Sequence, residues 1–180
     1  TISNIIWQPQ GDLAAVQMIA TDNKDRWLAT LNPDDAKLTS RHRLHDEGWI
    51  NWLFNEYGWL PGGEKLWYLS EGEGFSHFYT IALNKRRPKA LTSGEFEVMA
   101  PIISADGKQA FVLSNRSHPT EYDIYRLDLK SGDLEPLTDI KGVESFSLAP
   151  NEQQLLLRWS DSYTPAQISV LNLSNGELQQ

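Results

Sequence analysis

A serine and a histidine stand side by side at Ser76-His77, the first candidate pair for nucleophilic chemistry. Serine hydrolases of the α/β type carry their nucleophile in a Gly-x-Ser-x-Gly pentapeptide on a strand-to-helix turn. The nearest pentapeptide, residues 74–78 (Gly-Phe-Ser-His-Phe), lacks the second glycine. Neighbouring side chains of a strand also point to opposite faces, which is wrong for proton transfer. We therefore expect no catalytic residue in this chain.

Four possible metal ligands, His42, His45, Asp46 and Glu47, fall within six residues. Imidazole and carboxylate groups are ordinary zinc ligands, so a metal site is one interpretation. A polar loop between two structural repeats is the other, and we favour it. We expect neither a metal nor a cofactor.

The segment 49–59 is the most unusual in the chain, because aromatic residues crowd around an acidic one. It could line a channel and touch a peptide, with Trp49, Trp52 and Glu56 as the candidate substrate-facing residues. Its large rings could equally well fill the wedge between two twisted sheets. The sequence leaves both interpretations open.

Composition excludes several classes of protein. The absence of cysteine rules out disulfides, thiolate zinc sites and cysteine nucleophiles, and it fits the cytoplasm or a bacterial periplasm. A net charge of −8 disfavours nucleic acid as a partner. The one dense basic run, Lys85, Arg86, Arg87 and Lys89, is interpreted as a solvated hairpin tip. No apolar stretch approaches the roughly 20 residues of a membrane span, so we expect no membrane segment.

Four turn clusters recur along the chain and define a sequence repeat. They lie at residues 9–12 (Pro-Gln-Gly-Asp), 61–64 (Pro-Gly-Gly-Glu), 105–108 (Ala-Asp-Gly-Lys) and 150–153 (Pro-Asn-Glu-Gln), with starts 52, 44 and 45 residues apart. Such residues preset or tolerate the backbone angles of hairpin turns. An apolar or aromatic pair precedes each cluster, and a hydrophobic strand follows it. A second strand of alternating apolar residues comes later in each repeat.

A repeat of about 45 residues with four short strands is typical of a β-propeller blade. We predict an all-β fold, a partial propeller of about four four-stranded antiparallel blades from a ring of seven or eight. The approximate blades, within one domain over 1–180, are 1–48, 49–96, 97–142 and 143–180. A Leu-Thr pair closes the first three units but is missing from the fourth, so we expect the fourth blade to be incomplete at its outer strand. A β-sandwich is the competing fold, but it needs no 45-residue period.

The second repeat carries the most specific pattern, residues 66–79, with Ser70, Glu71, Gly74, Phe75, His77 and Tyr79 in the order Ser-Glu, acidic-Gly-aromatic, His-x-Tyr. It resembles the blade motif of the dipeptidyl peptidase IV branch of the prolyl oligopeptidase family. Residues 91–98 (Leu-Thr-Ser-Gly-Glu-Phe-Glu-Val) extend the resemblance, and residues 48–51 (Gly-Trp-Ile-Asn) match a Gly-Trp segment that leads into this blade. In this pattern we expect His77 to hydrogen-bond within its hairpin, with Glu71 or Glu73 in reach.

The resemblance implies the second half of the propeller of a serine exopeptidase, whose triad would lie in a C-terminal α/β-hydrolase domain outside this sequence. The propeller of that family gates and orients peptide substrates. Its substrate-amine Glu-Glu pair belongs to the first half, and neither Asp46-Glu47 nor Glu71 with Glu73 matches it. The resemblance further implies a periplasmic or secreted parent, although the cytoplasm stays open.

The alternative function is a stand-alone propeller that binds other proteins, like the Tol-associated propeller. A run of four blades leaves exposed flat faces and open edge strands, so we also expect self-association. A Gly-x-Ser-x-Gly in the parent polypeptide would distinguish the exopeptidase from the binding module.

Overall fold

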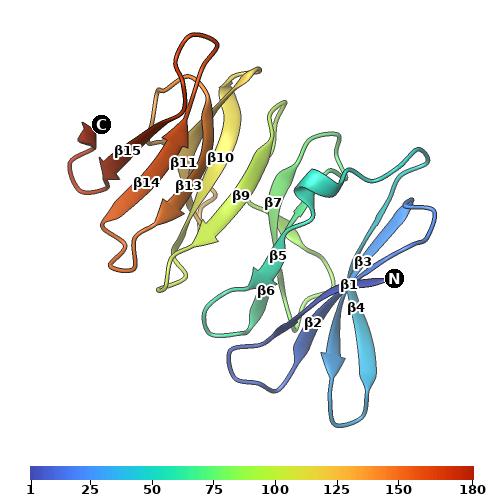
Figure 1. Cartoon of the computed structure of the whole chain (residues 1–180). Coiled ribbons are helices and arrows are strands. Elements are labelled where there is room, and N and C mark those ends of the chain that lie inside the picture. Colours follow the sequence, from blue (N-terminus) through green and yellow to red (C-terminus); the bar gives the residue numbers. More distant parts are fainter. The chain divides into compact units, whose positions relative to one another are not determined.

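The computed structural model describes all residues, Thr1–Gln180, and contains sixteen β-strands and a single 3-10 turn, η1 (Trp52–Phe54). The strands form four four-stranded antiparallel sheets, each in chain order (Figure 1). The first two sheets are β1 (Ile2–Trp7), β2 (Ala14–Ile19), β3 (Asp25–Asn32), β4 (Lys37–His45), and β5 (Tyr57–Trp59), β6 (Lys65–Ser70), β7 (His77–Ala82), β8 (Lys89–Ala90). The other two are β9 (Val98–Ile103), β10 (Gln109–His118), β11 (Glu121–Asp128), β12 (Leu134–Pro136), and β13 (Val143–Leu148), β14 (Gln154–Trp159), β15 (Gln167–Asn172), β16 (Leu178–Gln179). The predicted all-β fold of four four-stranded blades is confirmed.

The four turn clusters all connect the first strand of a sheet to its second. The hairpin geometry explains their residue types, since Gly11, Gly62 and Gly107 have φ of 85°, 93° and 66°. Left-handed backbone of this kind costs glycine little, because it has no Cβ to clash with the neighbouring carbonyl. The spacing of these turns therefore reports the spacing of the sheets.

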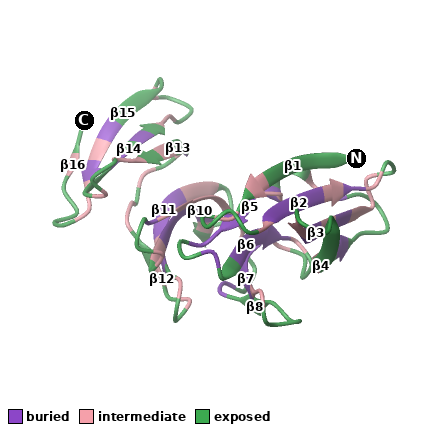
Figure 2. Ribbon diagram, turned by 90° about the horizontal axis from the view of Figure 1, so that it is seen from below, coloured by how far each residue is buried: buried purple, intermediate pink, exposed green.

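The chain divides into two compact units, Thr1–Ser93 and Gly94–Gln180, each holding two sheets. In unit 1 the core lies between the two sheets: Ala15 and Leu28 of the first sheet pack with Tyr57, Trp59 and other residues of the second. The indole of Trp59 also donates to the carbonyl of Ile6 at 3.0 Å. Large rings thus fill the space between the two sheets, and Figure 2 shows β2 and β6 largely buried.

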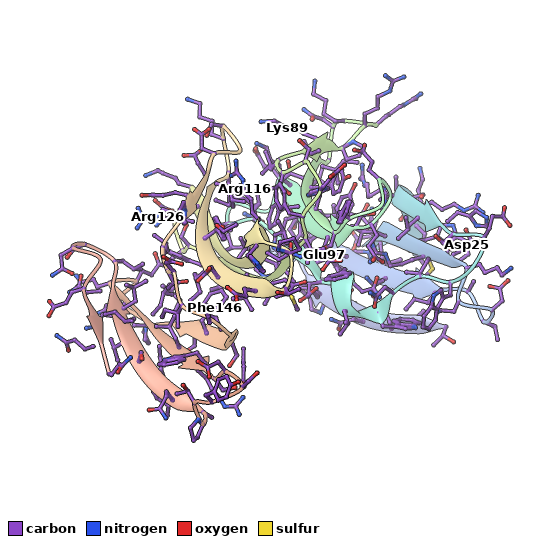
Figure 3. All side chains as sticks on the ribbon, turned by 90° about the horizontal axis from the view of Figure 1, so that it is seen from above. Asp25, Lys89, Glu97, Arg116, Arg126 and Phe146 are labelled. Carbon is purple, nitrogen blue, oxygen red and sulfur yellow. The ribbon has the colours of Figure 1, made fainter.

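In unit 2, Phe111, Leu113 and Ile124 of the third sheet pack against the fourth sheet, which supplies Val143, Leu155, Leu157 and Leu171. Burying one such side chain stabilises a fold by about 1.5–3 kcal/mol. The carboxylate of Glu152 accepts a hydrogen bond from the backbone N–H of Ala105 at 2.6 Å and so links the two turn clusters of this unit. At the other end of the third sheet, the Tyr122 hydroxyl donates to Glu97, and the guanidinium of Arg116 lies 5.5 Å from the ring centre of Phe96 (Figure 3).

The expected incompleteness of the fourth blade is wrong. Strand β16 pairs with β15 through Leu171 and Leu178 and through Val170 and Gln179, which completes a four-stranded sheet. It is two residues long, as is β8 in the second sheet. The Leu-Thr pair is therefore not required for a fourth strand, because two residues with free backbone groups can extend the ladder without it.

Candidate functional site

A cavity of about 580 Å³ lies in unit 1 beside the turn η1. Its lining combines polar residues of the first sheet with the aromatic and acidic segment of the second, namely Ser3, Asn4, Gln17, Trp52, Leu53, Asn55, Glu56, Tyr57 and Trp67. Two of the three predicted substrate-facing residues, Trp52 and Glu56, are therefore brought together here. The third, Trp49, is 72% exposed and does not line the cavity.

The polar groups of the turn η1 are satisfied locally, and two of its three side chains are exposed. The Asn51 side chain caps the turn, accepting from the backbone N–H of Leu53 at 3.0 Å. The Asn55 amide then donates to the carbonyl of Asn51 at 3.1 Å. Trp52 and Leu53 are 50% and 65% exposed, whereas Phe54 is buried and anchors the turn. The turn thus offers an apolar surface on a fixed backbone.

Arg26 of β3 holds this turn from within the protein. Its guanidinium donates to the carbonyls of Phe54 and Leu69 at 2.9 and 2.7 Å, and to the side-chain oxygen of Asn55. Burial lowers the pKa of Arg26 to about 10, while Tyr68, Glu71 and Glu56 act in the opposite direction. The arginine remains charged at neutral pH and joins β3, η1 and β6.

The polar rim of the cavity is a chain of hydrogen bonds between the two sheets. The Ser3 hydroxyl donates to Gln17 Oε1 at 2.8 Å, and Gln17 Nε2 donates to the carbonyl of Asn55 at 2.8 Å. The hydroxyl of Tyr57 donates to the carbonyl of Asn4, also at 2.8 Å. These contacts leave the rim rigid, with Glu56 as the acidic group of the lining and one of its oxygens, Oε2, buried.

The residues of the sequence pattern in the second repeat lie in and around the β6–β7 hairpin. Gly74 occupies the turn with φ of 96°, and its N–H donates to the carbonyl of Glu71 at 2.9 Å. His77 is buried, with Nδ1 3.1 Å from the hydroxyl of Thr92, and Tyr79 stacks on Tyr68 at 5.4 Å between ring centroids. Phe75 and Glu71 belong to the loop of the same hairpin. Of residues 66–79 only Trp67 lines the cavity, and none of the six residues named for the pattern does.

Two serine–histidine arrangements can be compared with a catalytic pair. Ser76 and His77 are both buried, and they are neighbours at the start of β7. Ser70 Oγ lies 3.4 Å from His42 Nε2, a contact that sequence spacing did not predict. Ser70 is only 1% exposed, so a substrate cannot reach its hydroxyl. Ser76 and His77 are equally inaccessible, at 0% and 2% exposed.

The four possible metal ligands are not assembled into a site. His42 stacks on Tyr68, with ring centroids 4.5 Å apart, whereas His45 is exposed and contacts Asp25 at 3.1 Å (Figure 3). No group of three or more histidine, aspartate or glutamate side chains in the structure could hold a metal ion.

The structure also lacks any helix with the length and apolar character that crossing a membrane demands.

The imidazole of His42 makes unit 1 sensitive to acid. Burial, assisted by the charge of Arg26, lowers its pKa from 6.5 to about 4, so the folded chain holds the ring neutral. The unfolded chain binds a proton near pH 6.5, so this contribution is complete above that pH and is lost as the pH falls towards 4. We expect the free energy of unfolding to fall by about 3 kcal/mol over this window.

Urea unfolding at a series of pH values measures this loss. A His42→Phe variant keeps a ring on Tyr68 and removes the titration, so its stability should depend less on pH over the same window. Identical pH dependence in the two proteins would show that His42 is not the group responsible.

A comparison with protein-family models assigns the chain to a family. Residues 1–166 match the family model described as the dipeptidyl peptidase IV (DPP IV) N-terminal region. The chain belongs to this family. Its membership confirms the resemblance that the residue pattern of the second repeat indicated.

Named relatives and a solved structure agree with this assignment. A protein of Aspergillus niger (strain CBS 513.88) named "Probable dipeptidyl-aminopeptidase B" is 30% identical over 99% of this chain and 21% of its own length. A protein of Aspergillus clavatus named "Probable dipeptidyl peptidase 4" is 35% identical over 56% of the chain and 14% of its own length. A crystal structure of a Bacteroides ovatus protein described as "a putative dipeptidyl aminopeptidase IV" matches with a TM-score of 0.82 at 16% identity, over 99% of this chain and 28% of that one. The matched part of this DPP IV N-terminal region therefore covers from about a seventh to just over a quarter of these three proteins.

Proposed function

We propose that this chain is part of the non-catalytic propeller of a serine exopeptidase of the dipeptidyl peptidase IV kind, in which it admits and orients peptides for an α/β-hydrolase domain. The observation that carries the proposal is the family match over residues 1–166. Within the chain, the buried positions of Ser70, Ser76 and His77 support a role without bond chemistry. Holding a substrate in a productive position is itself a large contribution to a reaction rate.

The cavity beside η1 is the part of this chain that we propose to contact the peptide. Trp52 offers an exposed ring for apolar side chains, and Glu56 offers a carboxylate for a cationic or amine group. The hydrogen bonds of Ser3, Gln17 and Tyr57 hold the rim in place before a peptide arrives. A rim that is already ordered loses less entropy on binding.

The activity of the full-length protein tests the proposal as a whole. We expect the polypeptide to contain a Gly-x-Ser-x-Gly pentapeptide and to release dipeptides from short Xaa-Pro or Xaa-Ala chromogenic substrates, with loss of all activity when that serine is replaced by alanine. A well-folded full-length protein that cleaves none of these peptides would contradict it.

Two exposed tryptophans of the same segment, Trp52 and Trp49, provide a matched pair for the cavity itself. In the full-length enzyme, Trp52→Ala should raise KM about tenfold with little change in kcat, because it removes an apolar contact worth about 1.4 kcal/mol. Trp49→Ala removes the same side chain outside the cavity, so its KM should stay near that of the parent. Equal effects of the two substitutions would remove the cavity from the proposal and leave the family assignment intact.

A further inference from the structure

A second cavity of unit 1, of about 430 Å³, has a different character from the one beside η1. One wall is formed by three consecutive residues of β4, Thr39 to Arg41. The other wall is Ile81 near the end of β7 and residues 83–86 at the start of the turn that leads to β8. Figure 2 shows β4 and the loop beside β8 mostly exposed, so the cavity is accessible from solvent.

The charge of this cavity is opposite to that of the protein. Its charged lining residues are Arg41, Lys85 and Arg86, and no carboxylate lines it, although the chain as a whole carries a net charge of −8. None of these three cations belongs to an ion pair in the structure. The hydroxyls of Thr39 and Ser40 and the amide of Asn84 add further hydrogen-bond donors.

Arg41 is held in position before any ligand binds. Its Nε donates to the hydroxyl of Thr30 at 2.9 Å, and Nη1 donates to the carbonyl of Leu83 at 2.8 Å. The remaining N–H groups of the guanidinium have no acceptor in the chain. The opposite wall is ordered as well, because the N–H of Lys85 donates to the carbonyl of Ala82 and the N–H of Leu83 donates to the carbonyl of Glu64. A fixed guanidinium beside two exposed cations is an arrangement that suits an oxyanion.

The structure separates the basic run that the sequence presented as one solvated tip. Lys85 and Arg86 line the cavity together with Arg41, which lies more than forty positions earlier in the chain. Arg87 and Lys89 do not line it, and Lys89, labelled in Figure 3, is the first residue of β8. All four residues are exposed, as a solvated run requires, and residues 85–87 lie in the β7–β8 connection, whereas Lys89 belongs to β8 and pairs with Thr80. Lys85 and Arg86 line the cavity in addition.

We propose that this basic cavity binds a ligand that carries phosphate or sulfate groups. The three cations and the hydroxyls complement an oxyanion, while Ile81 and Leu83 form an apolar wall for the part of the ligand that bears it. The cavity is lined by different residues from the site beside η1, so this inference does not depend on the proposed peptidase function. The phosphate group that this cavity would bind has two sources, a small soluble phosphate and the headgroup of a lipid.

Calorimetric titration of the 180-residue chain with inorganic tripolyphosphate tests whether the cavity binds a soluble phosphate. Co-sedimentation with phosphatidylcholine vesicles, with and without phosphatidic acid, tests whether it binds the phosphate headgroup of a lipid. We expect binding at one site that weakens as salt is added, because the attraction is electrostatic. The double variant K85Q/R86Q should weaken it at least about tenfold, since each lost charge-assisted hydrogen bond is a strong contact. Both side chains are exposed, so the variant should fold normally.

The control variant also loses two positive charges, but from unit 2. Lys108 and Lys141 are exposed lysines with surface ion pairs, and K108Q/K141Q should bind as the parent does. Binding of tripolyphosphate, of vesicles that contain phosphatidic acid, or of both, lost only in K85Q/R86Q, supports the proposal and identifies the source. Absence of binding to either probe, or equal behaviour of the two double variants, overturns it.

Discussion

Replacing Arg26 with methionine is expected to destabilise unit 1 by about 3 kcal/mol or more. Arg26 is only 3% exposed, and its removal leaves the carbonyls of Phe54 and Leu69 and the side-chain oxygen of Asn55 without their donor. A buried acceptor that loses its partner costs about 1–3 kcal/mol. The loss should appear as a lower urea midpoint in tryptophan fluorescence, because six of the seven tryptophans lie in unit 1.

Arg43→Met is the matched control for this substitution. Arg43 lies on the neighbouring strand β4 and pairs with Asp25 at 2.8 Å, but its side chain is 56% exposed. Exposed ion pairs contribute little to stability, so this variant should unfold close to the parent. If the two variants shift the midpoint equally, the three contacts of Arg26 do not hold η1 in place. Hydrogen exchange of the residue 50–70 amides should also accelerate in Arg26→Met alone.

The fold could be predicted because its determinants are local. Each turn cluster lies between the first and second strands of its sheet, and residues such as Gly11 and Gly107 are needed there for the positive φ of the turn. Because the clusters return at nearly constant spacing, the number of sheets follows from the chain itself. The missing Leu-Thr pair misled because a two-residue strand such as β16 depends on backbone pairing, which places few demands on residue type.

The candidate site could be predicted only in part, because its geometry depends on contacts between residues far apart in the chain. Trp52 and Glu56 were identified from the aromatic and acidic character of their segment, but Gln17 of the same lining lies in a strand that shows no local sign of a site. Trp67 lies within the pattern of residues 66–79, which indicated the family and not this cavity. Arg26 stands in an ordinary β-strand segment, and its acceptors come 28 to 43 positions later. Arg41, which lines the basic cavity together with Lys85 and Arg86, could not be identified from the sequence for the same reason.

Gly142→Ala is expected to produce a comparable loss in unit 2. Gly142 immediately precedes β13, with φ of 78°, and its carbonyl accepts from the N–H of Ser160 at 3.0 Å. A Cβ at this position would lie 1.8 Å from the carbonyl oxygen of Ser160, a backbone atom that cannot turn aside. The left-handed backbone costs an alanine about 1–2 kcal/mol, and relief of the overlap costs about 1–3 kcal/mol more. We expect a total of about 3 kcal/mol, measured as faster hydrogen exchange across β13 and β14.

Gly176→Ala separates backbone strain from steric overlap. Gly176 has a similar φ of 72° in the turn before β16, but a Cβ there meets no atom within 4 Å. Only the left-handed penalty of about 1 kcal/mol should remain, and exchange should change locally in β15 and β16. Equal destabilisation by the two alanines would mean that the β13–β14 pair can shift away from Ser160. The larger effect at Gly142 would instead show that the close approach of two backbones, and not the turn angle, makes glycine necessary at the start of the fourth sheet.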